Sequence, residues 1–155
     1  MKRKKIKKNP ARYKITWNSY LKLCYVLVIK IQMFILKHKG TFDGVVGIPR
    51  GGLIPAVLVS HCAKLPLLEE KDIKKGEVYI LVDDVSDTGV TLEEWQERFM
   101  AKGCGVVIAT LHTKPWTRVQ PYWHIEETEK WLIYPYESED KVGVRNNTSK
   151  CRRKK

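Results

Sequence analysis

The sequence predicts an α/β fold in which a mostly parallel central sheet is flanked by helices. Segments rich in strand-favouring residues alternate with helical patterns along the chain, and this alternation is typical of parallel sheets. The strand-like segments are short apolar runs, as expected for strands that are buried on both faces. A length of 155 residues suits one domain with a single core.

The expected elements follow each other in a regular order. Thr16 is a plausible N-cap for a long apolar helix that runs to Lys37 and that Gly40 ends. The elements expected after it are a strand at 42–48, a loop at 49–52, a helix at 53–64, a strand at 65–68, a charged turn at 69–77, a strand at 78–82, a helix at 92–102 followed by Gly103, and a strand at 105–111.

The net charge of +12 is concentrated at the two ends of the chain. Residues 1–8 and 145–155 each contain six Lys or Arg and no acid, which leaves 17 basic and 17 acidic residues between them. We therefore expect basic disordered tails at 1–12 and 141–155 around a domain at 13–140. The tails either keep the protein soluble or make a weak contact with nucleic acid.

The four cysteines are scattered and form no metal-binding or redox pair, so reduced thiols and a cytoplasmic location are expected. No signal peptide pattern follows the basic N-terminus. The apolar run Leu23–Leu36 is interrupted by Lys30 and Gln32 and is shorter than the ~20 residues of a membrane span, so no membrane partner is expected.

The segment that begins at Val78 carries most of the functional information. A buried strand leads into Asp83 and Asp84, then Asp87, and the run 88–91 (Thr-Gly-Val-Thr) opens a helix. A helix N-terminus with unpaired N–H groups suits a phosphate. The acids would repel a lone anion, but they suit sugar hydroxyls and a divalent cation. A phosphorylated ribose with magnesium meets all of these requirements.

Three parts of the chain carry a family resemblance. The run 82–91 (VDDVSDTGVT) resembles the phosphoribosyl-pyrophosphate (PRPP) motif of type I phosphoribosyltransferases, and 47–53 (GIPRGGL) resembles their pyrophosphate loop. Segments 114–117 (KPWT) and 130–137 (KWLIYPYE) resemble the base-binding segments of the xanthine-guanine type, most closely those of short archaeal purine enzymes. The resemblance spans about Thr16 to Glu137 and implies the type I fold with a small C-terminal hood at about 116–137.

The resemblance also implies roles for individual residues. Asp83 and Asp84 would face the ribose hydroxyls and Mg²⁺, and Asp87 would handle the proton on N7 of the purine; these three are the expected catalytic residues. The remaining expected contacts are Asp87, Thr88, Gly89, Val90 and Thr91 to the 5′-phosphate, Arg50 and Gly51 to pyrophosphate, and Lys114, Trp131 and Leu132 to the purine. For three of these residues the sequence also allows a purely structural role: Asp87 as a helix N-cap, Arg50 in a surface turn and Trp131 in the core.

Two departures from the family pattern stand out. Only nine residues, 69–77, connect two strands that many relatives join by a long mobile lid, and they include no Ser or Tyr. Lids exclude water, so a shortened one brings efficient transfer into question. Val90 stands where many relatives have Gly, and a β-branched residue requires an ordinary backbone conformation there.

The resemblance implies a Mg²⁺-dependent transferase that joins guanine, hypoxanthine or xanthine to PRPP in purine salvage. A dimer or tetramer is expected, as is common among relatives, and the apolar first helix could help to form it. The alternative is a regulator on the same fold that senses PRPP or a nucleotide and binds nucleic acid through its basic tails.

Overall fold

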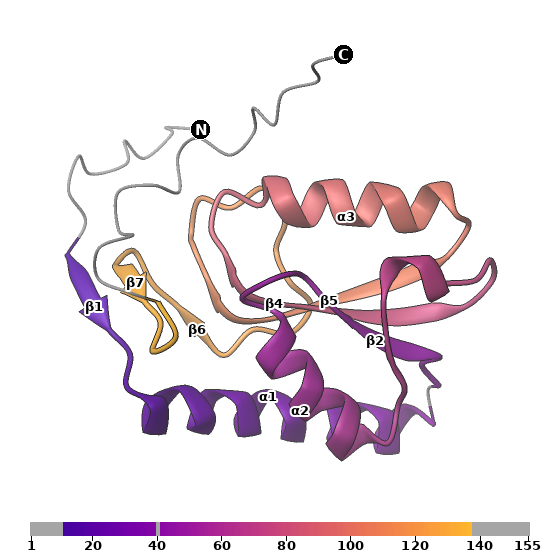
Figure 1. Cartoon of the computed structure of the whole chain (residues 1–155), viewed down its shortest axis with the longest axis horizontal. Coiled ribbons are helices and arrows are strands. Elements are labelled where there is room, and N and C mark those ends of the chain that lie inside the picture. The colour runs from indigo at the N-terminus through magenta and orange to yellow at the C-terminus, as the bar shows by residue number, and fades with distance from the viewer. Residues whose placement is uncertain (1–10, 40, 138–155) are drawn as a thin grey trace, which may run out of the picture.

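The computed structural model describes residues 11–39 and 41–137 (Figure 1). The expected basic tails fall almost entirely outside these ranges. Only residues 11 and 12 of the first tail are described, and Arg12 lies in a strand there, so the structured domain begins earlier than predicted.

The centre of the molecule is a five-stranded sheet in the order β3-β2-β4-β5-β6, with every pair parallel. This confirms the predicted fold class. The strands are β2 (Gly44–Gly47), β3 (Leu67–Leu68), β4 (Val78–Ser86), β5 (Gly105–Thr113) and β6 (Glu126–Glu127).

Helices cover both faces of the sheet. On one face lie α1 (Trp17–His38) and α2 (Leu53–Ala63), and on the other lies α3 (Val90–Ala101) (Figure 1). Each face has its own core cluster, and the buried residues of β4 divide between them: Ile80 and Val82 toward α1 and α2, Tyr79 and Leu81 toward α3. The continuous apolar strands follow from this burial on both sides.

The first helix begins as predicted, and its last residue is His38, one residue beyond the predicted Lys37. The Thr16 side chain accepts a hydrogen bond from the Ser19 amide at 3.2 Å, which is the expected N-cap. The C-cap is Lys39 with φ 47°, rather than Gly40. A left-handed C-cap favours glycine, but other residues can adopt this conformation at a modest cost in free energy. The use of Lys39 here could therefore not be predicted from the sequence.

The central strand is longer than predicted. It was expected to end at Val82, but it continues through both acids to Ser86, because β5 also extends to Thr113 and pairs with it along this length. Asp is unfavourable in strands, and here pairing with the neighbouring strand overrides propensity. Asp83 and Asp84 therefore lie within a strand and point to opposite faces.

The C-terminal segment is held by a strand that was not predicted. The strand β1 (Arg12–Lys14) pairs in parallel with β7 (Trp131–Ile133), and the Ile15 amide donates to the Ile133 carbonyl at 2.9 Å. The chain therefore enters the domain by pairing with the segment expected to form the hood, 116–137.

We expect that Gly52→Ala destabilises the fold by about 2 kcal/mol, a typical cost of overpacking. A Cβ at Gly52 would overlap the Val82 carbonyl oxygen and lie 2.9 Å from Asp83 Cα, and neither backbone group has room to move. Urea unfolding measures the loss. Gly105→Ala is the control, since its Cβ would meet only the Val78 side chain, whose nearest methyl carbon lies at 3.1 Å. Equal losses in both variants would contradict this account.

Candidate active site

The candidate site lies where the loops after β2, β4 and β5 meet. The helix that follows β2 and the helix that follows β4 leave toward opposite faces of the sheet (Figure 1). Such a switch point between adjacent parallel strands opens a crevice at their carboxyl ends, where ligands of α/β proteins bind. The expected site residues 50–51, 83–84, 87–89 and 114 lie at these strand ends and loops, and 90–91 open the helix that follows β4.

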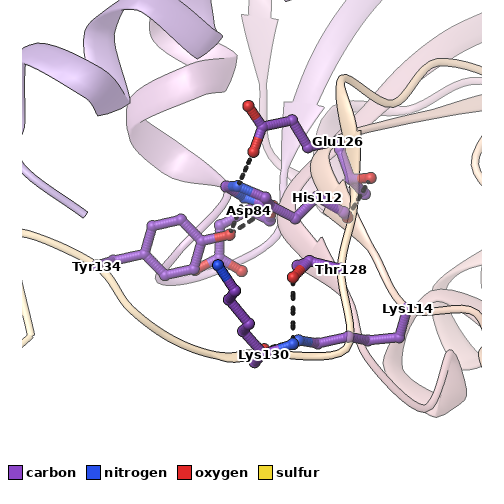
Figure 2. Close-up of polar contacts among 8 residues, drawn as sticks. Asp84, His112, Lys114, Glu126, Thr128, Lys130 and Tyr134 are labelled. Atoms are coloured by element: carbon purple, nitrogen blue, oxygen red, sulfur yellow. Dashed lines mark hydrogen bonds and ion pairs between the residues drawn. The ribbon is translucent and has the colours of Figure 1, made fainter. Parts of the chain in front are cut away.

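Asp84 is buried beneath two tyrosines of the C-terminal segment. Tyr136 donates its hydroxyl to the Asp84 carboxylate at 2.6 Å. Tyr134 donates to the Asp84 backbone carbonyl at 3.0 Å (Figure 2). The two rings stack with centroids 5.5 Å apart. Burial and then the Asp84 charge raise the pKa of Tyr136 far above its ordinary value, so its hydroxyl remains a donor.

Asp83 is the more accessible acid of the pair. Its side chain is half-buried and accepts a hydrogen bond from the Asp84 amide at 2.8 Å. Within 11–39 and 41–137, no three His, Cys, Asp or Glu residues gather into a metal cluster. The half-buried Asp83 carboxylate nonetheless fits Mg²⁺, which usually takes one or two protein carboxylates and fills its remaining positions with water and phosphate oxygens.

The loop after β4 offers backbone donors. Among the residues that the structure describes, the amides of Asp87, Thr88 and Gly89 donate to no protein acceptor. They precede the N-terminus of α3, whose dipole favours an anion. Gly89 (φ 82°) is the N-cap, so the alternative that Asp87 caps this helix is wrong. Val90 is the first helical residue and has an ordinary backbone, as predicted.

The loop after β2 presents Arg50 to solvent beside the buried acid. The Pro49–Arg50 peptide bond is cis, and Arg50 is exposed. Gly51 lies directly against the Asp84 carboxylate, so closely that a Cβ there would overlap it. The expected pyrophosphate-binding and ribose-binding residues are therefore in contact.

Lys114 and Asp87 come together around Trp116. The Lys114 ammonium lies 5.7 Å from the centre of the Trp116 ring and donates to the Lys130 carbonyl, and the Trp116 indole N–H donates to Asp87 at 3.2 Å. Burial lowers the pKa of Lys114, and the Asp87 charge opposes this shift. The structure thus joins two expected site residues through one that was not assigned a role.

Trp131 and Leu132 follow Lys130 on β7. The Trp131 side chain is half-buried, while Leu132 is only 8% exposed. The Lys130 ammonium lies over the Tyr13 ring at 4.8 Å, which fixes the start of this strand against β1. Stacking of Trp131 on a purine remains a prediction.

Comparison with known proteins identifies the family. No family model matches the chain. The crystal structure of purine phosphoribosyltransferase from Pyrococcus horikoshii is 33% identical, with a TM-score of 0.71 over 82% of this chain and 95% of that one. The chain belongs to the purine branch of the type I phosphoribosyltransferases.

Curated relatives agree with this assignment. Xanthine-guanine phosphoribosyltransferase of Nitratidesulfovibrio vulgaris Hildenborough is 28% identical over 125 residues, which is 67% of this chain and 74% of the relative. The enzyme of the same name from Desulfotalea psychrophila is 27% identical over 130 residues, 70% of this chain and 79% of that one. The Helicobacter pylori xanthine-guanine-hypoxanthine phosphoribosyltransferase (17% identical, TM-score 0.70, covering 84% and 96%) shares the fold.

Four residues around this phosphoribosyltransferase site were not predicted from the sequence. Tyr134, Tyr136 and Trp116 lay inside segments with family resemblance but had no individual roles, and His112 had none at all. The long apolar run of β5 could have indicated that His112 is buried, because its neighbours Leu111 and Thr113 belong to the same continuous buried run. No sequence signal pairs a tyrosine at 136 with an aspartate at 84.

His112 supports the tyrosine that holds Asp84. Its Nδ1 lies 2.8 Å from the Tyr134 hydroxyl, and its Nε2 lies 3.5 Å from the Glu126 carboxylate (Figure 2). The Tyr134 hydroxyl donates to a carbonyl, so it must accept from Nδ1–H. Burial, reinforced by the Lys114 charge, lowers the pKa of His112 from 6.5 to about 4.

We expect the stability of the protein to fall as the pH drops from neutrality. Unfolded His112 takes up a proton near pH 6.5, whereas folded His112 resists until about pH 4, so protonation favours unfolding in this window. Between pH 7 and pH 5 the loss is about 2 kcal/mol. Urea unfolding at both values checks it, with His112→Gln as the variant that keeps a donor but does not titrate. If His112→Gln lost the same stability between these pH values, another titrating group would be responsible for the loss.

Proposed function

We propose that this protein transfers the phosphoribosyl group of PRPP to a 6-oxopurine in purine salvage. The observation that carries the proposal is the meeting of Asp87 and Lys114 around Trp116, beside the backbone donors of the loop after β4. A base held there lies within reach of both a carboxylate and an ammonium, next to a phosphate site. Guanine, hypoxanthine and xanthine are the candidate bases.

The transfer would proceed by departure of pyrophosphate before the base is fully bonded. The bond from C1 of ribose to the pyrophosphate oxygen breaks with its electron pair, and a bond from C1 to N9 of the purine forms. Asp87 takes the proton that leaves N7 and stabilises the positive charge that develops nearby. Mg²⁺, bound with help from Asp83 and Asp84, would neutralise charge on the departing pyrophosphate.

The remaining protein groups would hold and orient PRPP. Arg50 can place two N–H donors on pyrophosphate oxygens, and Gly51 lets the backbone approach closely. The amides of 87–89, together with Thr88, Val90 and Thr91, would bind the 5′-phosphate. Asp84 would contact ribose with the carboxylate geometry that the Tyr136 hydroxyl fixes.

Lys114 would select the base. An ammonium has three donors and no acceptor, and one N–H already binds the Lys130 carbonyl. A second can donate to the O6 of a 6-oxopurine, whereas the 6-amino group of adenine would oppose it. Trp131 would stack on the ring and the Leu132 backbone would meet its edge.

Residues 69–77, which stand where many relatives have a long lid, pack against α3. Residues 70–72 form a short 3₁₀ helix, and Glu70 pairs with Arg98 of α3 at 3.2 Å. Turnover that is slower than in lidded relatives, or accompanied by hydrolysis of PRPP, fits this arrangement.

A cytoplasmic, soluble protein that forms a homo-oligomer completes the proposal. The regulator alternative, and any nucleic-acid contact, depend on tails outside the described residues.

The direct test is product formation from PRPP and Mg²⁺ with guanine, hypoxanthine, xanthine and adenine supplied separately. We expect nucleoside monophosphate from the 6-oxopurines and little from adenine, because Lys114 donates to O6. Omitting Mg²⁺ should abolish the product. Folded protein that binds PRPP but turns over none of the four bases would overturn the transferase and favour a PRPP sensor.

We expect that Asp87→Ala lowers kcat about 100-fold or more, the usual contribution of a general acid or base, while the Kd for PRPP changes little. Single-turnover kinetics and PRPP titration separate the two quantities. Glu97→Ala, an exposed acid on α3, serves as the control. Parallel losses of kcat and PRPP affinity would show that Asp87 binds PRPP rather than handling the proton.

A further inference from the structure

Trp116 contacts the two charged side chains that flank the base site, and the proposed function assigns it no role. Its indole N–H donates to Asp87 Oδ1 at 3.2 Å, and the Lys114 ammonium lies 5.7 Å from the centre of its ring. An indole has a donor at its edge and an electron-rich face, so one side chain can satisfy a carboxylate and an ammonium together. Trp116 therefore stands between a negative and a positive group.

The turn that carries Trp116 is tied to the loop after β4. The Thr117 amide donates to the Lys114 carbonyl at 3.1 Å and closes this turn. Pro115 occupies the first central position of the turn, where its ring presets the backbone. The Lys114 amide donates to the Ser86 carbonyl at 2.9 Å, and the hydroxyl oxygens of Ser86 and Thr117 lie 2.7 Å apart. The indole therefore extends from a backbone that is held against the loop after β4.

Asp87 and Lys114 are close to each other but do not pair. The Asp87 charge opposes the fall that burial causes in the pKa of Lys114, so the ammonium feels the carboxylate. Within 11–39 and 41–137, however, no carboxylate lies at salt-bridge distance from Lys114, whose ammonium contacts the Lys130 carbonyl and the Trp116 ring. In the same ranges the Asp87 carboxylate accepts a hydrogen bond only from the Trp116 indole. Opposite charges in a partly buried site attract each other, so a group between them must keep them apart.

We propose that Trp116 is a positioning residue that keeps Asp87 and Lys114 apart and presents both of them to the purine. This role rests on the proposed function, whereas the separation of the two charges does not. A direct ion pair would occupy the carboxylate that must accept the N7 proton and the ammonium that must donate to O6. With the indole in place, Asp87 uses one oxygen for Trp116 and keeps the other for the base, and Lys114 retains a donor for O6.

The two contacts of Trp116 should affect different kinetic quantities. The N–H orients the group that handles the proton in the transition state, so its loss should lower kcat with little change in the KM for the purine. The ring separates the charges before the base binds, so its loss should also raise that KM, since the base must then displace an ion pair. A role in folding alone would lower the stability of the protein without dividing kcat from KM in this way.

The test compares two substitutions of Trp116 with the same two substitutions of Trp95. Trp95 on α3 is also half-buried and has the Arg98 guanidinium 5.2 Å from the centre of its ring, but it lies outside the site. Trp116→Phe keeps a ring and removes the donor, so kcat with hypoxanthine should fall about 10-fold, as on losing a hydrogen bond to a charged group, with KM within about 2-fold. Trp116→Ala should also raise the KM for hypoxanthine about 10-fold. Trp95→Phe and Trp95→Ala should match the wild type in both quantities.

A crystal structure of Trp116→Ala supplies a readout that does not depend on turnover. We expect the Lys114 ammonium to lie within about 4 Å of the Asp87 carboxylate in this variant, the distance of an ion pair. If Trp116→Ala fails to fold, Trp116→Leu replaces it, because leucine keeps apolar volume but offers neither a donor nor an aromatic face. An Asp87 and a Lys114 that stay apart in the variant would overturn the separating role of the ring.

Two kinetic results would overturn the positioning role. One is a kcat for Trp116→Phe equal to that of the wild type, and the other is an equal loss of kcat in Trp95→Phe, which would assign the effect to stability. An unchanged KM for hypoxanthine in Trp116→Ala would overturn the contribution of the ring. A wild type that turns over no base would refute the proposed function, and the crystal structure of the variant would still decide whether Trp116 separates the two charges.

Discussion

The site depends on the close approach of the loop after β2 to the acidic half of β4. The chain leaves β2 toward one face and β4 toward the other, so the crevice opens between these two strands. The loop can lie across β4 only because Gly51 and Gly52 have no side chains: each would otherwise overlap Asp84 or the Val82 carbonyl. This backbone contact brings an arginine loop and a pair of acids into one crevice without any side chain between them.

Asp84 connects three parts of the chain that are distant in sequence. It belongs to β4, touches Gly51, and accepts the Tyr136 hydroxyl. The same tyrosine lies 5.6 Å from the ring of Tyr20 on α1, so the C-terminal segment is held by an aromatic cluster as well as by its hydroxyl groups. A buried carboxylate needs such partners because desolvation is costly, and the partners in turn fix the segment that carries Trp131 and Leu132.

Sequence reasoning was most successful where local chemistry decides the outcome. The Thr16 cap, the alternation of strands and helices, and the ordinary backbone of Val90 all follow from residue preferences. The extension of β4 to Ser86 could not be predicted, because it depends on pairing with an equally long β5. The strand β1 is a basic and aromatic triplet whose pairing with β7, 119 residues away in register, leaves no mark on the sequence.

The features of the candidate site fall into the same two groups, those that the local sequence indicates and those that depend on tertiary contacts. Its acids, glycines and Lys114 could be proposed because they stand in contiguous motifs. The contacts that hold them could not: Trp116 to Asp87, Tyr136 to Asp84, and His112 to Tyr134 each join separate segments through geometry alone. The left-handed C-cap at Lys39 is likewise set by the tertiary structure rather than by the local sequence.

The packed connection between β3 and β4 has a practical consequence for crystallography. Ile73 is 7% exposed, and the Lys102 ammonium donates to the Glu70 carbonyl at 2.6 Å, so this segment is already anchored against α3. These contacts would have to break before the segment could close over a ligand. Crystals grown without ligand should therefore tolerate diffusion of substrate into the lattice, because an anchored segment is less prone than a mobile flap to disturb lattice contacts.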